Sequence, residues 1–338
     1  MNNKISDEQV NKYDNNSKNY LYENIFKEKY QILETIGEGG YGKVYKSKTN
    51  SNEFRAIKEI DLEKYKQLKE ENYSTNIEED INKLKTYINN EINNMKKCSY
   101  GDTNIYSVHL YDYLCNDKKI YIIMDLCDDN LSSLLKKKKS GFSVEEISDI
   151  IHQLNHTFKI MNKFNIIHRD LKLENILVKY LNEEKTKYIV KLGDYGISRE
   201  FDNQKTNRFT IVGTLYTEAP EIMKNEKYND KCDLWSLGVI IYMLFFKKPP
   251  FLGQNEIALL NNIKIGLKKP LKTTNNELLD DLLSKLLKAD PKKRISWKQY
   301  FNHPFCKTGD IKIDINSIDK KSNNYLDENL FKEKYQIL

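Results

Sequence analysis

Residues 168–175 read His-Arg-Asp-Leu-Lys-Leu-Glu-Asn, and no other stretch of the chain is as informative. A carboxylate, a cation and an amide alternate with Leu within this short block. Further blocks follow it in order: Asp-Tyr-Gly at 194–196, Ala-Pro-Glu at 219–221, Asp-Leu-Trp-Ser-Leu-Gly at 233–238 and Asp-Pro-Lys-Lys-Arg at 290–294. So many spaced blocks in one order are not a chance pattern, and they are interpreted together.

A glycine-rich block precedes them, Gly-Glu-Gly-Gly-Tyr-Gly-Lys-Val at 37–44. Glycine lets backbone N–H groups approach phosphate oxygens where a Cβ would clash. Alone, the pattern also suits a plain hairpin turn. A strand pattern continues after Gly42 and no helix begins there, which excludes a Rossmann dinucleotide site. Lys58 follows sixteen residues later on the next expected strand, in Ala-Ile-Lys at 56–58.

Together these blocks resemble the eukaryotic protein kinases, whose catalytic loop has the pattern H-R-D-L-x-x-x-N. The resemblance covers about residues 30–305. It implies an α+β, two-lobed fold with a small β-rich N-lobe, a larger helical C-lobe and the ATP cleft between them. The predicted domains are a disordered leader at 1–22, a kinase domain at 23–306 (N-lobe 23–127, C-lobe 128–306), and a linker plus partial repeat at 307–338.

Hydrophobic patterns predict the same division into strands and then helices. Strands are expected at 30–36, 43–47, 54–59, 108–114 and 120–126. Helices are expected at 60–97, 145–164, 232–246 and 276–287, with residues 166–178 irregular. Ser143 and Glu146 form an expected capping box before the second helix. The third helix is apolar on all sides, which indicates a buried helix.

The resemblance assigns the catalytic roles. Asp170 would accept or orient the proton of the substrate hydroxyl, and Lys172 would steady the γ-phosphate of ATP. Asn175 and Asp194 would hold the Mg²⁺ ions, for which carboxylate and amide oxygens are suitable ligands. Lys58 would grip the α- and β-phosphates while paired with a helix glutamate.

That glutamate is assigned to Glu91, which shares the inner region of its expected helix with an apolar stripe. The stripe consists of Ile81, Leu84, Ile88, Ile92 and Met95. Its separation of 33 residues from Lys58 is longer than the family usually shows. Glu78 and Glu79 remain alternatives, although they would leave a long following loop. The additional residues, around 62–77, are interpreted as a charged insertion ahead of the helix.

The resemblance also implies an ATP site. Its predicted residues are Ile36, Gly37, Gly39, Gly42, Val44, Ala56, Lys58, Met124 as gatekeeper, the hinge residues Asp125 and Cys127, and Leu177. Ile36, Val44 and Ala56 would cover the adenine from above, with Leu177 below it. Ordinary strand packing is the alternative interpretation for the apolar members, and both can hold at once.

Two arginines match structural or regulatory positions of the family. Arg169 would bind a phosphorylated activation loop bidentately, with Thr210 as the phosphosite. Thr206 and Ser198 are weaker candidates for that site. Arg294 would pair with Glu221 of the Ala-Pro-Glu block in a structural rather than catalytic bond.

The chain also departs from the family pattern. Tyr195 stands where the family has Phe, which adds a hydroxyl that needs a partner when buried. We expect this to tune the inactive state rather than to abolish activity. In residues 213–218 the Tyr stands one position early, so peptide specificity is not transferable. Lys172 and Thr214 favour Ser/Thr over Tyr as the acceptor.

Composition excludes other classes. The chain has 338 residues and a formal net charge of +6, yet only five Arg against 50 Lys, which argues against nucleic-acid recognition. Its longest apolar run, 237–246, is about half of a membrane span. The N-terminus has no signal-peptide pattern, and the five Cys have no metal-ligand spacing. We expect an intracellular, cytoplasmic protein that binds neither membrane nor nucleic acid.

The predicted function is therefore that of an ATP- and Mg²⁺-dependent Ser/Thr protein kinase. Its expected partners are protein substrates with a Ser/Thr acceptor and an upstream activating kinase. The alternative is a pseudokinase or scaffolding nucleotide-binding module. Family pseudokinases typically lose the residues equivalent to Lys58, Asp170 or Asp194, and all three are present here.

A repeat lies outside the kinase-like blocks. Residues 18–33 read KNYLYENIFKEKYQIL, and residues 323–338 read NNYLDENLFKEKYQIL. Thirteen of the sixteen positions match at a constant offset of 305 residues. An offset of this length is a domain period rather than a solenoid period. We interpret the second copy as the start of a tandem domain, with a functional tail as the alternative.

Overall fold

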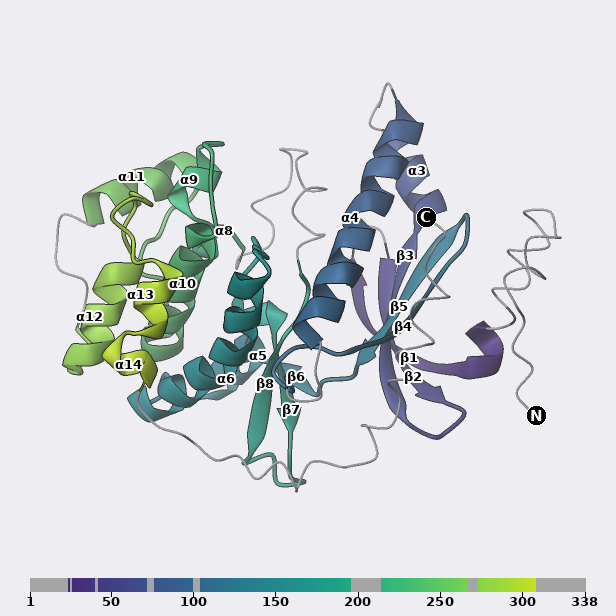
Figure 1. The fold of residues 1–338 in the computed structure, drawn as a ribbon, viewed down its shortest axis with the longest axis horizontal. Coiled ribbons are helices and arrows are strands. Elements are labelled where there is room, and N and C mark those ends of the chain that lie inside the picture. The colour runs from purple at the N-terminus through teal and green to yellow at the C-terminus, as the bar shows by residue number, and fades with distance from the viewer. Residues whose placement is uncertain are drawn as a thin grey trace. The chain divides into compact units, whose positions relative to one another are not determined.

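The computed structural model of the chain describes residues 24, 26–39, 42–71, 76–99, 104–195, 214–266 and 273–307 (Figure 1). The described residues form two compact units. The sheet unit contains the residues up to Thr86 and His109–Leu126, and the helical unit contains Tyr87–Val108 and the residues from Cys127 onward. A β-rich part followed by a helical part confirms the predicted α+β class. The exact domain boundaries stay predictions.

The sheet unit is built on a five-stranded antiparallel sheet in the order β1-β2-β3-β5-β4. Its strands are β1 (Tyr30–Gly39), β2 (Gly42–Thr49), β3 (Phe54–Asp61), β4 (Leu110–Cys115) and β5 (Lys119–Asp125). Ile57 and Ile123 are paired across β3 and β5 and are fully buried. Phe26 and Tyr121 complete this core. Burial of these side chains fixes which face of the sheet is covered.

The stretch expected to be helical, 60–97, contains two helices, and its first two residues belong to the end of β3 instead. α3 (Leu62–Glu71) follows β3 directly and buries Leu62 and Tyr65. α4 (Ile77–Ser99) carries the predicted apolar stripe, of which only Ile81 is not fully buried. The predicted charged insertion corresponds mainly to α3. Charge and helical periodicity continue across both helices, so the pattern does not reveal where one ends.

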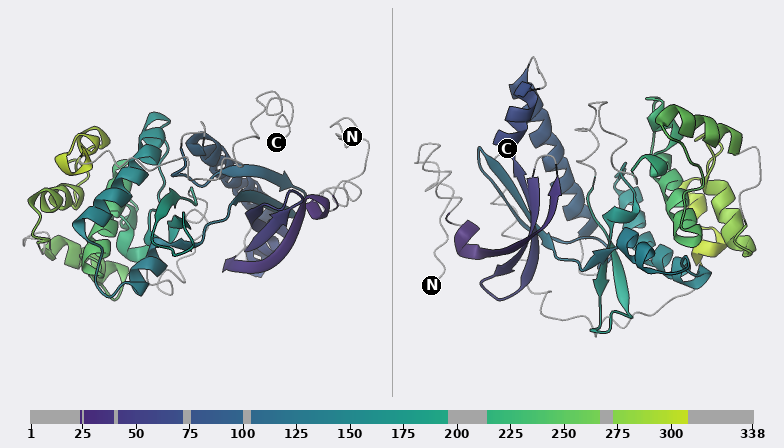
Figure 2. Two further views of the ribbon diagram at one scale, coloured as in Figure 1. Left: turned by 90° about the horizontal axis from the view of Figure 1, so that it is seen from below. Right: turned by 180° about the vertical axis from the view of Figure 1, so that it is seen from behind.

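The helical unit contains a small sheet and many helices (Figure 2). The strands are β6 (Asp129–Asn130), β7 (Ile176–Tyr180) and β8 (Tyr188–Leu192). The helices are α5 (Leu131–Lys137), α6 (Val144–Lys163), the 3-10 turn η1 (Leu173–Asn175), α8 (Thr214–Thr217), α9 (Pro220–Met223), α10 (Lys231–Phe246), α11 (Glu256–Gly266), α12 (Glu277–Leu286), α13 (Trp297–Phe301) and α14 (Pro304–Lys307). The predicted capping box of Ser143 and Glu146 is present at the start of α6. Residues 166–178, which were predicted to be irregular, contain η1 and most of β7.

α10 is the buried helix that its apolar sequence predicts. Trp235 is fully buried within it, and α12 packs against it. A Cβ on Gly238 would lie 2.8 Å from the Leu286 Cβ, closer than side-chain carbons approach. Gly238 therefore permits the close packing of α10 and α12, and α10 provides a rigid support at the centre of the unit.

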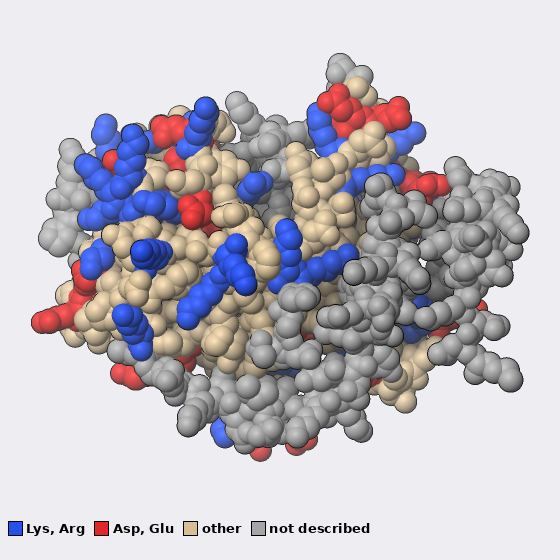
Figure 3. Space-filling view, in the orientation of Figure 1, with Lys and Arg blue, Asp and Glu red and all other residues tan. Residues whose placement is uncertain are grey.

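Charged side chains cover much of the surface. On the face shown in Figure 3, the described Lys and Arg side chains are scattered among acidic and uncharged residues. Many of them belong to exposed ion pairs, such as Lys83 with Glu79 at 2.6 Å. Such pairs contribute little to stability. Among the described residues, no helix has the length and apolar character needed to cross a bilayer.

Candidate active site

Residues 168–175 lie between α6 and β7, and their polar side chains converge. The Lys172 Nζ lies 2.7 Å from the Asp170 Oδ2. The Asn175 Nδ2 donates to the same oxygen at 3.0 Å and to the Asp170 carbonyl at 2.8 Å. Asp170 and Asn175 are both buried. The carboxylate of Asp170 is therefore held in one orientation by a cation and an amide.

Asp233, at the start of α10, anchors this segment. Arg169 has a φ of 67°, a left-handed conformation that costs a non-glycine residue about 1 kcal/mol. The Asp233 carboxylate accepts hydrogen bonds from the backbone N–H groups of His168 at 2.7 Å and Arg169 at 2.9 Å. These charge-assisted bonds offset the strain. The buried helix thus fixes the backbone immediately before Asp170.

His168 joins this loop to the segment that carries Asp194. Its Nε2 lies 3.0 Å from the Gly193 carbonyl, which only accepts, so Nε2 carries the proton. The Gly193 N–H in turn donates to the Asn175 carbonyl at 3.0 Å. Asp194 follows with a φ of 59°, again left-handed. The two segments that carry Asp170, Asn175 and Asp194 are therefore bonded to each other.

Tyr195 is buried directly after Asp194, and its hydroxyl has the partner that the sequence required. The hydroxyl lies 2.5 Å from the Ser107 Oγ. The thiol of Cys98, near the end of α4, is also close enough to influence the hydroxyl. Burial raises the pKa of Cys98 to about 12 and that of Tyr195 well above its usual value. Both groups are neutral at physiological pH, and the bond of Tyr195 to Ser107 joins uncharged groups.

Replacing Tyr195 by Phe should remove this hydrogen bond while keeping the ring in place. We expect the free energy of unfolding to fall by about 1 kcal/mol, the net value of a buried hydrogen bond. Urea unfolding of Tyr195→Phe, Ser107→Ala and the double variant measures it. The two single effects should overlap rather than add, because both variants break the same bond. Fully additive effects would contradict the assignment.

Several residues of the predicted ATP site share one face of the sheet. Val44 on β2 is paired with Lys58 on β3, and Ala56 is paired with Met124 on β5. Directly paired residues point to the same side of an antiparallel sheet, as do residues two apart on one strand. Ala56 and Lys58 are two apart. All four therefore lie on the face opposite the core residue Ile57.

The other predicted ATP-site residues are distributed over both units. Ile36 is 47% exposed on β1. The Asp125 carboxylate accepts hydrogen bonds from the Tyr111 hydroxyl and the His109 N–H, both at 2.9 Å. Cys127 and Leu177, the latter on β7, belong to the helical unit. A common site for all of them stays a prediction.

Burial distinguishes the three candidate partners of Lys58. Glu91 is 3% exposed and lies on the covered side of α4. Glu78 and Glu79 are both exposed, and Glu79 pairs with Lys83. A buried carboxylate requires a compensating partner, whereas an exposed one does not. Glu91 is thus the buried one of the three, and the pairing of Lys58 with any of them stays a prediction.

Glu221 and Arg294, paired by the sequence interpretation, are in contact. The guanidinium donates to both carboxylate oxygens of Glu221, at 2.7 and 2.9 Å. It also donates to the carbonyl of Lys231 at 2.7 Å and to that of Lys288 at 2.9 Å. Both charged side chains are almost fully buried. The pair connects α9 to the segment before α13.

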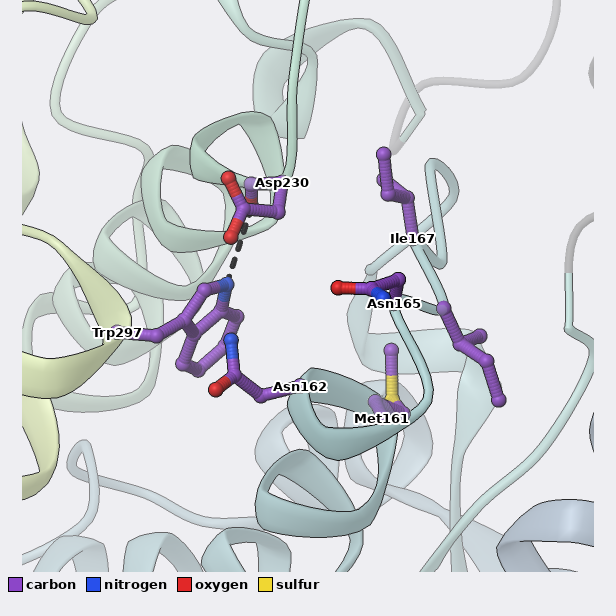
Figure 4. Close-up of a pocket in the computed structure, with 7 residues that line it drawn as sticks. Met161, Asn162, Asn165, Ile167, Asp230 and Trp297 are labelled. Atoms are coloured by element: carbon purple, nitrogen blue, oxygen red, sulfur yellow. Dashed lines mark hydrogen bonds between the residues drawn. The ribbon is translucent and has the colours of Figure 1, made fainter.

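A small pocket of about 290 Å³ lies elsewhere in the helical unit (Figure 4). Trp297 forms one wall, and its Nε1 donates to the Asp230 carbonyl at 3.2 Å. The opposite wall is Met161 and residues 165–167. The pocket contains none of the predicted catalytic or ATP-site residues.

A comparison with known protein families matches residues 30–306 to the protein kinase domain. The match covers most of the chain and includes each motif block from the glycine-rich block to Arg294. The chain belongs to the protein kinase family. A β-sheet region followed by a helical region is consistent with the two-lobed kinase fold, although Tyr87–Val108, predicted in the N-lobe, belongs to the helical unit.

The curated relatives to which the chain is similar are also named as protein kinases. It is 30% identical over 281 residues to the serine/threonine-protein kinase Nek5 of Homo sapiens, covering 82% of this chain and 36% of Nek5. It is 29% identical over 346 residues to the serine/threonine-protein kinase ATG1 of Debaryomyces hansenii, covering 90% and 37%. It is 31% identical over 309 residues to the calcium-dependent protein kinase 4 of Plasmodium berghei, covering 89% and 54%. The chain thus spans little more than a third of Nek5 or ATG1.

Sequence reasoning missed two structural supports in the kinase domain, one of the loop at 168–175 and one of the segment that carries Asp194. Asp233 was recognised as part of a motif but given no contact with the loop. Ser107, which bonds Tyr195, lies in no motif. The position of Asp233 one turn into a buried helix was a usable signal, because a buried carboxylate needs donors.

Some predictions for the kinase domain fall outside the described residues. They are the leader at 1–22, the phosphosite Thr210 with its alternatives Thr206 and Ser198, and the partial repeat at 323–338. These stay predictions.

Proposed function

We propose that this chain is an ATP-dependent protein kinase that transfers the γ-phosphate of ATP to Ser/Thr hydroxyls of proteins. One observation carries the proposal. The buried Asp170 carboxylate is held by Lys172 and Asn175, in a loop bonded to the segment of Asp194. Phosphoryl transfer depends on positioning and charge stabilisation, and this arrangement is suited to both.

In this proposal Asp170 accepts and orients the proton of the acceptor hydroxyl. Its Oδ2 is occupied by Lys172 and Asn175, which aligns the carboxylate before substrate arrives. Lys172 then has a second task, because its ammonium group also stabilises charge on the transferred phosphoryl group. The strained backbone at Arg169, held by Asp233, keeps Asp170 at its position.

Asn175 and Asp194 fit a hard cation such as Mg²⁺. The described hydrogen bonds of the Asn175 side chain use its nitrogen, so its carbonyl oxygen is oriented away from Asp170. An amide oxygen and a carboxylate are the ligands that Mg²⁺ prefers. When bound, the cation would neutralise phosphate charge. Residues 175 and 194 would hold it, and the bonds through Gly193 set their spacing.

The glycine-rich block and Lys58 would bind the phosphates of ATP. Within the sheet, only Gly42 among the three predicted glycines requires the absence of a side chain. A Cβ on Gly42 would lie 1.8 Å from the Glu59 carbonyl oxygen, whereas Gly37 and Gly39 have room for one. Glycine at 37 and 39 therefore needs another reason, and close approach of phosphate is such a reason.

Gly42→Ala and Gly39→Ala should accordingly affect different properties, stability and ATP binding. Gly42→Ala should lower the free energy of unfolding by at least about 1 kcal/mol, because β3 blocks the added methyl group. Gly39→Ala should leave stability unchanged and raise KM for ATP. Thermal unfolding and ATP titration of both variants measure this. Destabilisation by Gly39→Ala equal to that by Gly42→Ala would contradict the assignment.

The acceptor is proposed to be Ser or Thr because Lys172 and Thr214 match the Ser/Thr branch and the relatives carry that description. Protein substrates, Mg²⁺ use and a cytoplasmic location belong to the same proposal. Phosphorylation of Thr210 by an upstream kinase would recruit Arg169. The Arg169 guanidinium lies 5.8 Å from the centre of the Tyr228 ring, inside the helical unit.

Thr210→Ala should lower kcat by about tenfold or more if Arg169 binds the phosphorylated residue. Phosphate–Arg bonds of this kind order an activation loop. Kinase assays on protein whose phosphorylation has been mapped by mass spectrometry measure the effect, with Thr206→Ala as the matched control. Unchanged activity of Thr210→Ala would contradict the choice of phosphosite.

Phosphate transfer from ATP to a degenerate peptide library tests the function itself. The purified 338-residue chain should label Ser/Thr peptides in the presence of Mg²⁺ and should not label Tyr peptides. Binding of ATP without any transfer, even by protein phosphorylated at Thr210, would instead support the pseudokinase alternative. The library also reads out the sequence preference around the acceptor.

A further inference from the structure

The first copy of the terminal repeat occupies a defined place in the sheet unit. Residues 26–29 form a helical turn, and residues 30–33 are the beginning of β1. Every one of these eight residues, Phe26–Leu33, is identical in Phe331–Leu338. The structure therefore shows what this sequence does when it binds to the sheet.

Phe26 makes the main contact. It is 6% exposed and stacks on Tyr121, with 4.3 Å between ring centroids. It packs in one cluster with Ile57 and Ile123. We call this place the Phe26 site and define it by Ile57, Tyr121, Ile123 and residues 47–49 of β2, which pair with residues 30–32. A buried Phe dominates such a contact, since burial of one side chain contributes strongly to docking.

Further contacts of the segment also use only repeated residues. Tyr30 lies against Phe26 at 5.6 Å, and its burial raises its pKa. The Lys29 Nζ lies 3.8 Å from the Asp112 Oδ2. The Glu28 carbonyl accepts a hydrogen bond from the Asn50 Nδ2 at 2.8 Å. A second copy of the same sequence would make the same contacts.

The pairing of β1 with β2 is interrupted at the end of the repeated block. The pairing of β1 with β2 shifts register between Ile32 and Glu34, at a bulge around Leu33. Beyond the bulge, residues 34–39 pair with β2 as far as Gly39 opposite Gly42, with a second register shift between Thr35 and Gly37. Bulges separate stretches of pairing. Residues 26–33 can therefore leave the sheet while the glycine-rich block keeps its strand pairing.

We propose that residues 331–338 dock at the Phe26 site of their own chain in exchange for residues 26–33. Identical side chains give both copies the same intrinsic affinity for the site. The first copy has the advantage of direct connection to β1, so the tail is the minor occupant until the first copy is weakened. The tail thus competes for one edge of the sheet, whether or not the chain has kinase activity.

The connection is long enough for this exchange. Residues 308–330, which number 23, separate α14 from Phe331. Extended, they span up to about 75 Å. A compact chain of about 300 residues has a radius of gyration of only roughly 19 Å. The tail therefore reaches any surface of its own domain, and intramolecular docking benefits from a high effective concentration.

A disulfide between two introduced cysteines detects the exchange in the 338-residue chain. Gln31 is directly paired with Lys48 across β1 and β2. The Cα atoms of such a pair are close enough for a disulfide between cysteines at the two positions. Gln336 is the repeat equivalent of Gln31. Lys48→Cys with Gln336→Cys should give a disulfide inside one chain, mapped by mass spectrometry to separate it from the five native cysteines. Lys48→Cys with Gln31→Cys is the positive control, and Lys48→Cys with Asp314→Cys is the control outside the repeat.

The yield of the 48–336 disulfide should depend on how strongly each copy of the repeat binds the Phe26 site. Adding Phe26→Ala should raise the 48–336 disulfide several-fold, and adding Phe331→Ala should abolish it. No 48–336 disulfide, in a protein whose 48–31 disulfide forms fully, would overturn the proposal. A disulfide found only between two chains would overturn its intramolecular form.

Thermal unfolding gives a second, independent readout. Phe331→Ala alone should leave Tm unchanged, because the first copy holds the site. Phe26→Ala should lower Tm, and Phe26→Ala with Phe331→Ala should lower it further, because the tail no longer substitutes. Equal Tm values for Phe26→Ala and the double variant would overturn the proposal. The catalytic activity enters neither measurement, so failure here is separate from failure of the proposed function.

Discussion

Asp170→Asn should reduce phosphate transfer by at least about 10²-fold, the usual contribution of a positioned acid–base group. The replacement removes the negative charge that is proposed to orient the acceptor hydroxyl. It keeps an oxygen that accepts from Asn175 or Lys172, the two groups that bond the Asp170 Oδ2. The fold should therefore remain intact, with Tm close to that of the wild type. Transfer to a Ser/Thr peptide and thermal unfolding of the same samples measure the two effects.

Glu174→Gln is the matched control for that experiment. Glu174 lies in η1 one residue before Asn175 and is exposed. Removing its charge changes the loop's net charge by the same amount but touches no predicted catalytic group. Its activity should equal that of the wild type. Equal incorporation by Asp170→Asn and wild type would show that Asp170 has been misassigned.

Arg294→Met should destabilise the protein by about 3–5 kcal/mol, since it leaves a buried carboxylate without its cation. Glu221 is 1% exposed and cannot regain water without opening the packing of α9. The carbonyls of Lys231 and Lys288 lose donors at the same time. Urea unfolding followed by fluorescence gives the change in free energy.

An exposed ion pair provides the comparison. Lys285 lies 2.6 Å from Asp281 within α12, and both side chains are almost half exposed. Lys285→Met should therefore cost no more than about 0.5 kcal/mol. If Arg294→Met were as mild as Lys285→Met, the buried pair would not hold the end of the helical unit together.

Local chemistry made several elements predictable from the sequence. The capping box at Ser143 and Glu146 involves two neighbouring residues, and it forms as expected. α10 could be recognised because apolar residues surround it on all sides. The motif blocks are likewise short, and their order alone identified the family. Each of these signals is contained in a few adjacent residues.

Contacts between distant segments were not predictable in the same way. Ser107 and Tyr195 are 88 residues apart, and nothing near Ser107 indicates a bond to the catalytic segment. Asp233 binds the backbone of residues 168 and 169, and backbone N–H groups leave no trace in a sequence. The separate helix α3 was hidden because its charges match those of α4. Such features depend on which segments the fold brings together.

The hydroxyl of Tyr195 also affects how large a fraction of molecules has this side chain displaced from its buried position. Any conformation in which this side chain leaves its place must break the bond to Ser107, a loss of about 1 kcal/mol that a Phe would not incur. One kilocalorie per mole corresponds to roughly a fivefold ratio of states. Compounds that bind only a conformation with this side chain displaced should therefore bind the natural chain about five times more weakly than its Phe variant.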